Sequence, residues 1–191
     1  MVELFAKEES DYLRLHDVRP VAGGHERYAS VQNALRAIEA DAAAGQIGRL
    51  RLVAVHDAAR PCVAVDAIAQ VIATADDEGA AILAIPLWGT IKRTDASGRI
   101  IDTVPREHLY QASTPQAFRL EVLQSGYEDA TIDSAGGSIT DDAQLVALAG
   151  HDVRVCVDAA TNIKVTTASD LRLAELILQA EGDSCRAIHR S

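Results

Sequence analysis

The chain has 191 residues, 48% of them hydrophobic and 24% charged, which is enough to bury the core of one globular domain. Its formal net charge of -10 opposes binding to nucleic acid, because such binding depends on many Lys and Arg side chains. No apolar run is long enough to span a membrane, and the first residues lack the pattern of a signal peptide. We therefore expect one cytoplasmic domain over residues 1–191.

The first half of the chain alternates between two kinds of hydrophobic pattern. Apolar residues recur at helical spacing over Val31–Ala42 and again over Val65–Ala75. Each stretch is followed by an apolar run of strand length, first Leu50–Val55 and then Ala80–Ile85. This alternation predicts an α/β fold with a mostly parallel sheet and helices on both faces.

A polar hairpin is predicted next, over residues 90–104. The sequence Asp95-Ala96-Ser97-Gly98 is a turn signal between two extended-looking segments. Two such strands are too short to be stable alone, so they need a surface on which to pack. We call residues 90–104 the arm and expect it to join a homodimer.

The last part of the chain returns to the same alternation. An amphipathic stretch over residues 119–127 and a second one over residues 141–149 predict two short helices. Val153–Val157 and Ile163–Thr166 have the composition of the last strands. A final helix is expected from about Asp170.

The densest group of chemically useful side chains, His56–Pro61, follows a predicted strand directly. Ligands of open α/β sheets bind beyond the carboxyl ends of strands. There Asp57 could hold Mg²⁺ or a ribose hydroxyl, and Arg60 could bind a phosphate or polyol. A turn residue followed by a surface charge would give the same six letters, so both interpretations stay open.

Three further segments have polar groups in positions that suit either function or structure. The paired glycines of Gly23–Arg27 allow close approach to a flat base, but also suit a flexible turn. Lys164 lies between apolar neighbours and needs a partner, either an anionic substrate or a carboxylate. Thr114 and Thr140 stand at predicted element boundaries, where helix capping is their ordinary role.

Taken together, these segments resemble the 2-C-methyl-D-erythritol 4-phosphate cytidylyltransferases of the non-mevalonate isoprenoid pathway. The matching segments keep the family's order over about Val18 to Leu178: Gly23-Gly24-x-Glu26-Arg27-x-x-Ser30-Val31, Val55–Pro61, Thr90-Ile91-Lys92-Arg93, Thr114–Phe118, Ile139–Ala143 and Asn162–Thr166. Six segments in register make the resemblance specific.

The resemblance implies a Rossmann-like nucleotidyltransferase fold in which the acceptor's phosphate attacks the α-phosphorus of CTP. Pyrophosphate leaves, and a divalent cation, normally Mg²⁺, assists. The residues it implies for nucleotide binding are Gly24, Ser30, Asp57 and Ala58, with Asp57 also beside the metal.

For the second substrate, a polyol phosphate, the resemblance implies a separate set of residues. Arg60, Thr90, Thr114 and Thr140 would line its pocket. Arg106 and Lys164 would position its phosphate for attack, with Arg106 reaching in from the arm of a second subunit. Catalysis of this kind is positioning and charge neutralisation.

The sequence also departs from the family pattern. Gly89, Ser113 and His25 replace residues that are usually Asp, Gln and acidic, respectively. At the start, the family's first strand, glycine-rich loop and Pro-Lys-Gln segment have no counterpart, so the domain is expected to be N-terminally incomplete. Such a loop supplies donors to the triphosphate, so we expect the chain as written to bind little CTP and to be inactive.

Two alternatives to this function remain open. A ribitol 5-phosphate cytidylyltransferase shares the fold and the chemistry and differs in its acceptor. From another class, the chain could be a catalytically inactive binding or dimerisation module.

Overall fold

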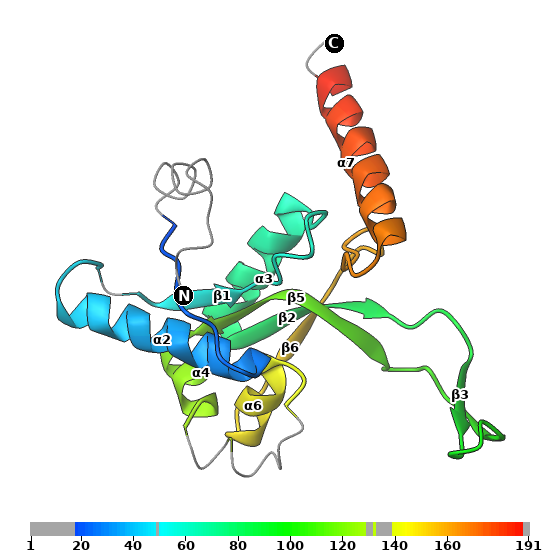
Figure 1. Cartoon of the computed structure of the whole chain (residues 1–191), viewed down its shortest axis with the longest axis horizontal. Coiled ribbons are helices and arrows are strands. Elements are labelled where there is room, and N and C mark those ends of the chain that lie inside the picture. The colour runs from blue at the N-terminus through cyan, green and yellow to red at the C-terminus, as the bar shows by residue number, and fades with distance from the viewer. Residues whose placement is uncertain (1–17, 49, 129–131, 133–138, 189–191) are drawn as a thin grey trace.

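The computed structural model describes residues 18–48, 50–128, 132 and 139–188, with side chains of the final helix described as far as residue 180 (Figure 1). The first residues, on which the expectation of an N-terminally incomplete domain depends, lie outside this description.

The described elements alternate along the chain much as the sequence predicts. The helices are α2 (Arg27–Ala43), α3 (Val65–Glu78), α4 (Leu120–Gly126), α6 (Asp142–Leu148) and α7 (Ala168–Ile188). The strands are β1 (Leu52–Val55), β2 (Ala80–Pro86), β3 (Ile91–Thr94), β4 (Ile100–Val104), β5 (Tyr110–Arg119) and β6 (Arg154–Val157).

Four strands form the main sheet, in the order β1-β5-β2-β6. β2 and β6 pair in parallel, whereas β5 lies antiparallel between β1 and β2. The strands β1, β2 and β6 therefore run in one direction, and the predicted α/β fold is confirmed with β5 as the exception. Because Pro86 pairs with Tyr110, the first half of β5 lies at the carboxyl ends of the other strands.

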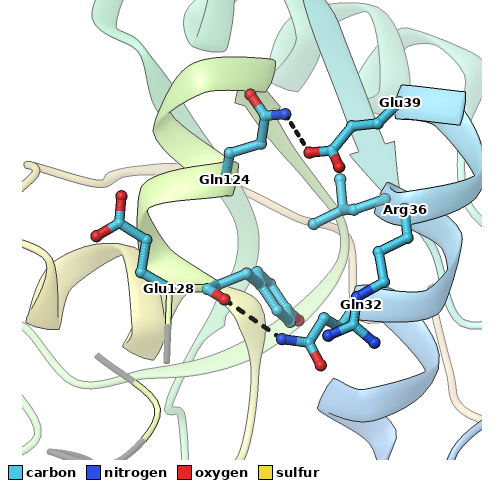
Figure 2. A pocket seen from close by; sticks show the side chains of 7 residues that line it. Gln32, Arg36, Glu39, Gln124 and Glu128 are labelled. Atoms are coloured by element: carbon cyan, nitrogen blue, oxygen red, sulfur yellow. Dashed lines mark hydrogen bonds between the residues drawn. The ribbon is translucent and has the colours of Figure 1, made fainter. Parts of the chain in front are cut away.

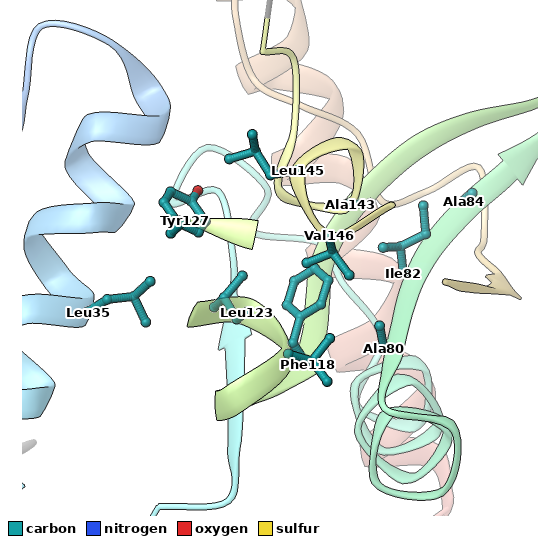
Figure 3. Close-up of a cluster of buried hydrophobic side chains, with 11 residues drawn as sticks. Leu35, Ala80, Ile82, Ala84, Phe118, Leu123, Tyr127, Ala143, Leu145 and Val146 are labelled. Carbon is teal, nitrogen blue, oxygen red and sulfur yellow. The ribbon is translucent and has the colours of Figure 1, made fainter. Parts of the chain in front are cut away.

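Alternate residues of β2 bury themselves on opposite faces of this sheet. Ala80, Ile82 and Ala84 join a cluster with side chains from α2, α4 and α6, and Figure 3 shows Phe118 of β5 near its centre. On the other face, Ala81 and Leu83 pack with side chains from α3 and β6. Helices thus cover both faces, as the alternation predicts.

The ladder between β2 and β5 is interrupted where β5 contains a proline. Ile82 pairs with Gln116, but Ala84 pairs with Ala112, which leaves residues 113–115 without partners on β2. A proline inside a central strand normally costs a ladder hydrogen bond, and here none is required. Thr114 and Pro115 thus lie inside β5, not at an element boundary as the sequence suggested.

One local prediction is wrong. Ile163–Thr166 is not a strand: this segment joins the loop after β1 through one bond, from Val165 N to Ala59 O at 2.8 Å. The helix expected from about Asp170 is confirmed and begins at Ala168. Its first turn is capped by Thr167, whose Oγ1 accepts from Asp170 N at 3.3 Å.

The arm forms a separate two-stranded antiparallel sheet, β3 and β4, that projects from the main sheet (Figure 1). Asp95 closes its turn by accepting bonds from Ser97 N at 2.9 Å and Arg99 N at 3.0 Å. Ile100 and Ile101 are 60% and 62% exposed. Among the described helices, none combines the length and apolar character that crossing a membrane requires.

Candidate functional site

A polar pocket of about 260 Å³ opens at the carboxyl ends of the parallel strands. Its walls come from the start of α2, the loop after β1, the interrupted part of β5, the start of α6 and the chain after β6. The lining residues are Arg27, Asp57, Arg60, Ala112, Ser113, Thr114, Gln116, Thr140, Asp141 and Lys164.

Asp57 lies at the electrostatic centre of this pocket. Its Oδ2 is 3.0 Å from Lys164 Nζ and 3.6 Å from Arg60 Nε, and its Oδ1 is 3.8 Å from Arg27 Nε. Burial alone would raise the pKa of Asp57, but the hydrogen bond and charge of Lys164, followed by the charges of Arg27 and Arg60, lower it. Asp57 is therefore an anion surrounded by three cations.

Arg60 is the most buried of these cations, with 8% of its surface exposed. Its Nη1 donates to the carbonyl of Asn162 at 2.7 Å, but its buried Nε has no hydrogen-bond partner among the described residues. An unpaired buried donor is unfavourable, so an oxygen of a bound ligand that accepted this N–H would gain a strong hydrogen bond.

The hydroxyl of Thr114 links two loops rather than pointing freely into the pocket. It accepts from Asp57 N at 3.0 Å and lies 3.0 Å from Nδ1 of His56. The other ring nitrogen, Nε2, is 3.1 Å from the carbonyl of Arg60, which can only accept. In the neutral ring Nδ1 is then the acceptor, so Thr114 donates its hydroxyl proton to His56.

The buried carboxylate of Asp158 connects two segments that contribute residues to the pocket, β5 and the chain after β6. This carboxylate is 6% exposed and accepts from Ala159 N at 2.9 Å, from Asn162 Nδ2 at 2.7 Å and from the Ser113 hydroxyl. Asn162 Nδ2 also donates to the carbonyl of Thr114 at 2.9 Å. The chain before Lys164 is thereby fixed to β5.

The start of α6 is fixed to β5 in a similar way. Asp141 Oδ1 caps the helix by accepting from Gln144 N at 3.0 Å, so the cap is Asp141 and not Thr140. Its Oδ2 accepts from Gln116 Nε2 at 3.0 Å.

Five of the ten residues expected at the site line the pocket: Asp57, Arg60, Thr114, Thr140 and Lys164. The other five lie outside its lining. Gly24 and Ser30 contact each other, since Gly24 N donates to Ser30 Oγ at 3.0 Å. A Cβ at Gly24 would fall 2.4 Å from Ala29 Cβ, so this position requires glycine for contact with α2.

Ala58, Thr90 and Arg106 complete the group outside the pocket lining. Arg106 donates instead to the carbonyl of Trp88 at the base of the arm. Its predicted role involves a second subunit, and it stays a prediction.

Sequence reasoning gave no role to Arg27, although this residue stood within the quoted Gly23–Arg27 segment. Its Nη2 is 2.7 Å from Oδ2 of Asp142, which is fully buried. Burial opposes the charge on Arg27, but the hydrogen bond to Asp142 and the charges of Asp142 and Asp57 together outweigh it and raise the pKa of the guanidinium. The feature of the sequence that could have indicated a role for Arg27 is a cation three positions after the glycine pair.

A second pocket, of about 290 Å³, lies between α2 and α4 (Figure 2). Its lining includes Gln32, Arg36, Glu39 and Gln124, and Gln124 Nε2 donates to Glu39 Oε1 at 2.6 Å. None of the residues expected at the site lines it.

No group of three or more metal-ligating side chains occurs in the described part of the chain. Mg²⁺ does not require one, because it commonly binds one or two carboxylates together with substrate phosphates. Asp57 is the residue that could provide such a carboxylate, once Lys164 no longer occupies its Oδ2.

An α/β sheet with cations around a carboxylate at its strand ends is typical of enzymes that act on small phosphorylated substrates. The model of the family "2-C-methyl-D-erythritol 4-phosphate cytidylyltransferase" matches residues 2–180. The chain therefore belongs to this family of nucleotidyltransferases.

Individual relatives agree with the family model. A 2-C-methyl-D-erythritol 4-phosphate cytidylyltransferase of Nitrosomonas eutropha is 40% identical over 185 residues, covering 92% of this chain and 76% of the relative. One of Rhodopirellula baltica is 42% identical over 170 residues, covering 87% and 66%. The chain thus spans about two thirds to three quarters of these relatives' length.

Solved structures show the same fold. The 2-C-methyl-D-erythritol 4-phosphate cytidylyltransferase of Thermus thermophilus has a TM-score of 0.68 and 34% identity, covering 82% of this chain and 71% of that one. A 4-diphosphocytidyl-2C-methyl-D-erythritol synthase has a TM-score of 0.72 and 30% identity, covering 91% and 76%. The predicted nucleotidyltransferase fold is thereby confirmed, and the ribitol 5-phosphate alternative has no better support.

Proposed function

We propose that this chain transfers the cytidylyl group of CTP to 2-C-methyl-D-erythritol 4-phosphate in isoprenoid precursor biosynthesis, in the cytoplasm. A phosphate oxygen of the acceptor forms a new bond to the α-phosphorus of CTP. The bond from that phosphorus to the β-phosphate oxygen breaks, and pyrophosphate leaves with the bond's electrons.

The observation that carries the proposal is the group of three cations around Asp57. In a protein with a net charge of -10, a phosphorylated substrate binds only where positive charge is concentrated. Arg60 Nε is 3.6 Å from Asp57 Oδ2 and has no hydrogen-bond partner among the described residues, and Nζ of the half-exposed Lys164 pairs with Asp57, 3.0 Å away. These two groups suit the phosphate and hydroxyls of a polyol phosphate.

Asp57 is the residue we propose as the ligand of Mg²⁺. The metal would neutralise charge that develops on the phosphates as the α-phosphorus changes partners. The protein's own contribution is to hold Asp57 in place through its backbone, where Asp57 N donates to Thr114 Oγ1 at 3.0 Å.

We further propose that the functional unit is a homodimer joined by the arm. Ile100 and Ile101 are too exposed for a stable free hairpin, at 60% and 62%. A two-fold interface would bury the same surface on both copies and bring Arg106 toward the partner's pocket.

A pyrophosphate-release assay with CTP, Mg²⁺ and either acceptor tests the proposal. The sequence alone predicts an inactive chain, and this assay decides between that expectation and the proposed function. Under the proposed function we expect turnover with 2-C-methyl-D-erythritol 4-phosphate and at least tenfold slower turnover with ribitol 5-phosphate. Asp57→Asn and Lys164→Met should abolish release without unfolding the protein. Equal rates with both acceptors would contradict the assigned substrate.

Calorimetry with CTP and the acceptor added separately distinguishes an enzyme from a binding module. Binding of both ligands with no release of pyrophosphate, in the presence of Mg²⁺, would favour the inactive module. If neither ligand binds, the assignment of this pocket as a substrate site is wrong.

A further inference from the structure

Asp57 is flanked on two sides by cations that differ in their distance from it and in their other contacts. Lys164, 47% exposed at its side chain, lies 3.0 Å from Oδ2. Arg27, 34% exposed, lies on the side of Oδ1, with its Nε 3.8 Å away. The first contact is a full hydrogen-bonded ion pair, and the second is too long for a hydrogen bond.

Arg27 is fixed from behind by groups that do not reach the pocket. Its Nη2 bonds at 2.7 Å to Asp142, at the start of α6, and Asp142 is fully buried. The Tyr127 hydroxyl, at the end of α4, donates to the other oxygen of Asp142. Tyr127 belongs to the core cluster in Figure 3, so this anchor is part of the hydrophobic core.

The proposed reaction places a conflicting demand on Lys164. Its ammonium cannot hold Oδ2 of Asp57 and also bind the phosphate of the acceptor at full strength. When it turns to the phosphate, Oδ2 of Asp57 loses its nearest cation and becomes open to Mg²⁺, so the carboxylate needs another group to hold its second oxygen, Oδ1. Arg60 Nε is 3.6 Å from the same Oδ2, but the proposed function assigns this donor to the substrate, so it cannot serve Asp57 alone.

We propose that Arg27 is a positioning residue: anchored by Asp142 and Tyr127, it closes on Asp57 and keeps that carboxylate in place when Lys164 moves to the substrate phosphate. The inference rests on the proposed function for the identity of the phosphate. The replacement of Lys164 by Arg27 as the cation that contacts Asp57 involves only residues of this chain.

A structural test needs no activity. In Lys164→Met the cation that competes for Asp57 is absent, so a crystal structure of this variant should show Arg27 Nε within hydrogen-bond distance of Oδ1, instead of 3.8 Å away. A distance that is unchanged or longer would overturn the inference. If the parent chain shows no turnover, the proposed function fails. The distance between Arg27 and Asp57 in the Lys164→Met variant still shows whether Arg27 moves to Asp57 when Lys164 is absent.

A kinetic test distinguishes two roles of Arg27: positioning Asp57 for the reaction, and neutralising the buried charge of Asp142. Arg27→Met alone leaves Asp142 as an uncompensated buried charge and could unfold the protein. The double variant Arg27→Met with Asp142→Asn removes both charges and keeps an acceptor for Tyr127. We expect it to fold and to lose about 10- to 100-fold in kcat, with KM for the acceptor changed less than threefold.

Two comparisons complete the experiment. Arg27→Lys keeps the charge and should recover at least half of the lost activity on a logarithmic scale. Arg36→Met removes an exposed arginine from the same helix, at the second pocket, and should match the parent in kcat. Parent-like kcat in the folded double variant would overturn the positioning role.

Discussion

Asp158 beneath the pocket and Asp102 on the arm are the same residue type in opposite surroundings. Asp158 is 6% exposed and accepts three hydrogen bonds, which join it to β5 and to the chain after β6. Asp102 has a side chain that is 51% exposed and pairs with Arg93 on the neighbouring strand. The pocket is therefore fixed by contacts within the chain, whereas the arm has an exposed surface, which we propose binds a second copy.

The largest effect should come from removing the carboxylate beneath the pocket. In Asp158→Ala, donors from Ser113, Ala159 and Asn162 lose their acceptor, so we expect a loss of about 3–5 kcal/mol in the free energy of unfolding. Asp102→Ala should cost less than about 1 kcal/mol. Urea unfolding measures both, and equal losses would break the contrast between the two regions.

Activity should be more sensitive than stability to the exposed cation of the pocket. Lys164→Met should lower kcat/KM by about 100-fold or more, because a charge facing the reacting phosphate is lost. Its exposed pair with Asp57 should contribute only about 1 kcal/mol or less to stability. Arg154→Met is the control, since it removes a cation whose exposed pair, Glu78, lies outside the pocket.

The arm should respond in its association and not in its folding. Ile101→Asp should raise the dissociation constant of the proposed dimer about 10- to 100-fold. Leu176→Asp is a matched control on α7, because Leu176 is 62% exposed, as is Ile101. Sedimentation velocity over a concentration series measures both variants. Dimerisation that survives Ile101→Asp unchanged would exclude this face of the arm.

The smallest effect is expected at Asp170, whose carboxylate completes the cap at the start of α7. Bonds from Thr166 N, the Thr166 hydroxyl and Thr167 N lower the pKa of Asp170 to about 2. Because the folded pKa is below the unfolded one, the stabilisation is present above about pH 4 and is lost as pH falls toward 2. Asp170→Asn should therefore melt slightly lower than the parent at pH 7 and equally at pH 2. A constant difference across this range would contradict the capping role.

Local patterns in the sequence were sufficient for the elements that carry chemistry. The run before His56 predicted β1, and Asp57 followed from the position of a charged residue directly after a buried strand. Lys164 was found because a cation among apolar neighbours requires a partner. That partner proved to be Asp57, which no local pattern identifies.

Predictions from the sequence failed in two situations. Either the contact that fixes a residue is with a residue far away in the chain, or a segment with a strand-like sequence lacks a pairing strand. Arg27 and Asp142 are separated by 115 positions, so their ion pair has no local signature. Ile163–Thr166 has the alternation of a strand but pairs with no strand that the structure describes, and Val165 bonds to a loop instead. In β5, Pro115 suggested a boundary, because the interrupted ladder that accommodates it appears only in the folded sheet.

The central position of β5 also sets an order of assembly. β1 and β2 leave the ribosome first, yet among the described strands each must wait for β5 before it gains an antiparallel partner. Of the described pairings, only the hairpin of β3 and β4 joins strands that are close in sequence. Residues preceding Arg119 therefore emerge during synthesis with apolar strands exposed, and they depend on fast completion of β5 to avoid aggregation.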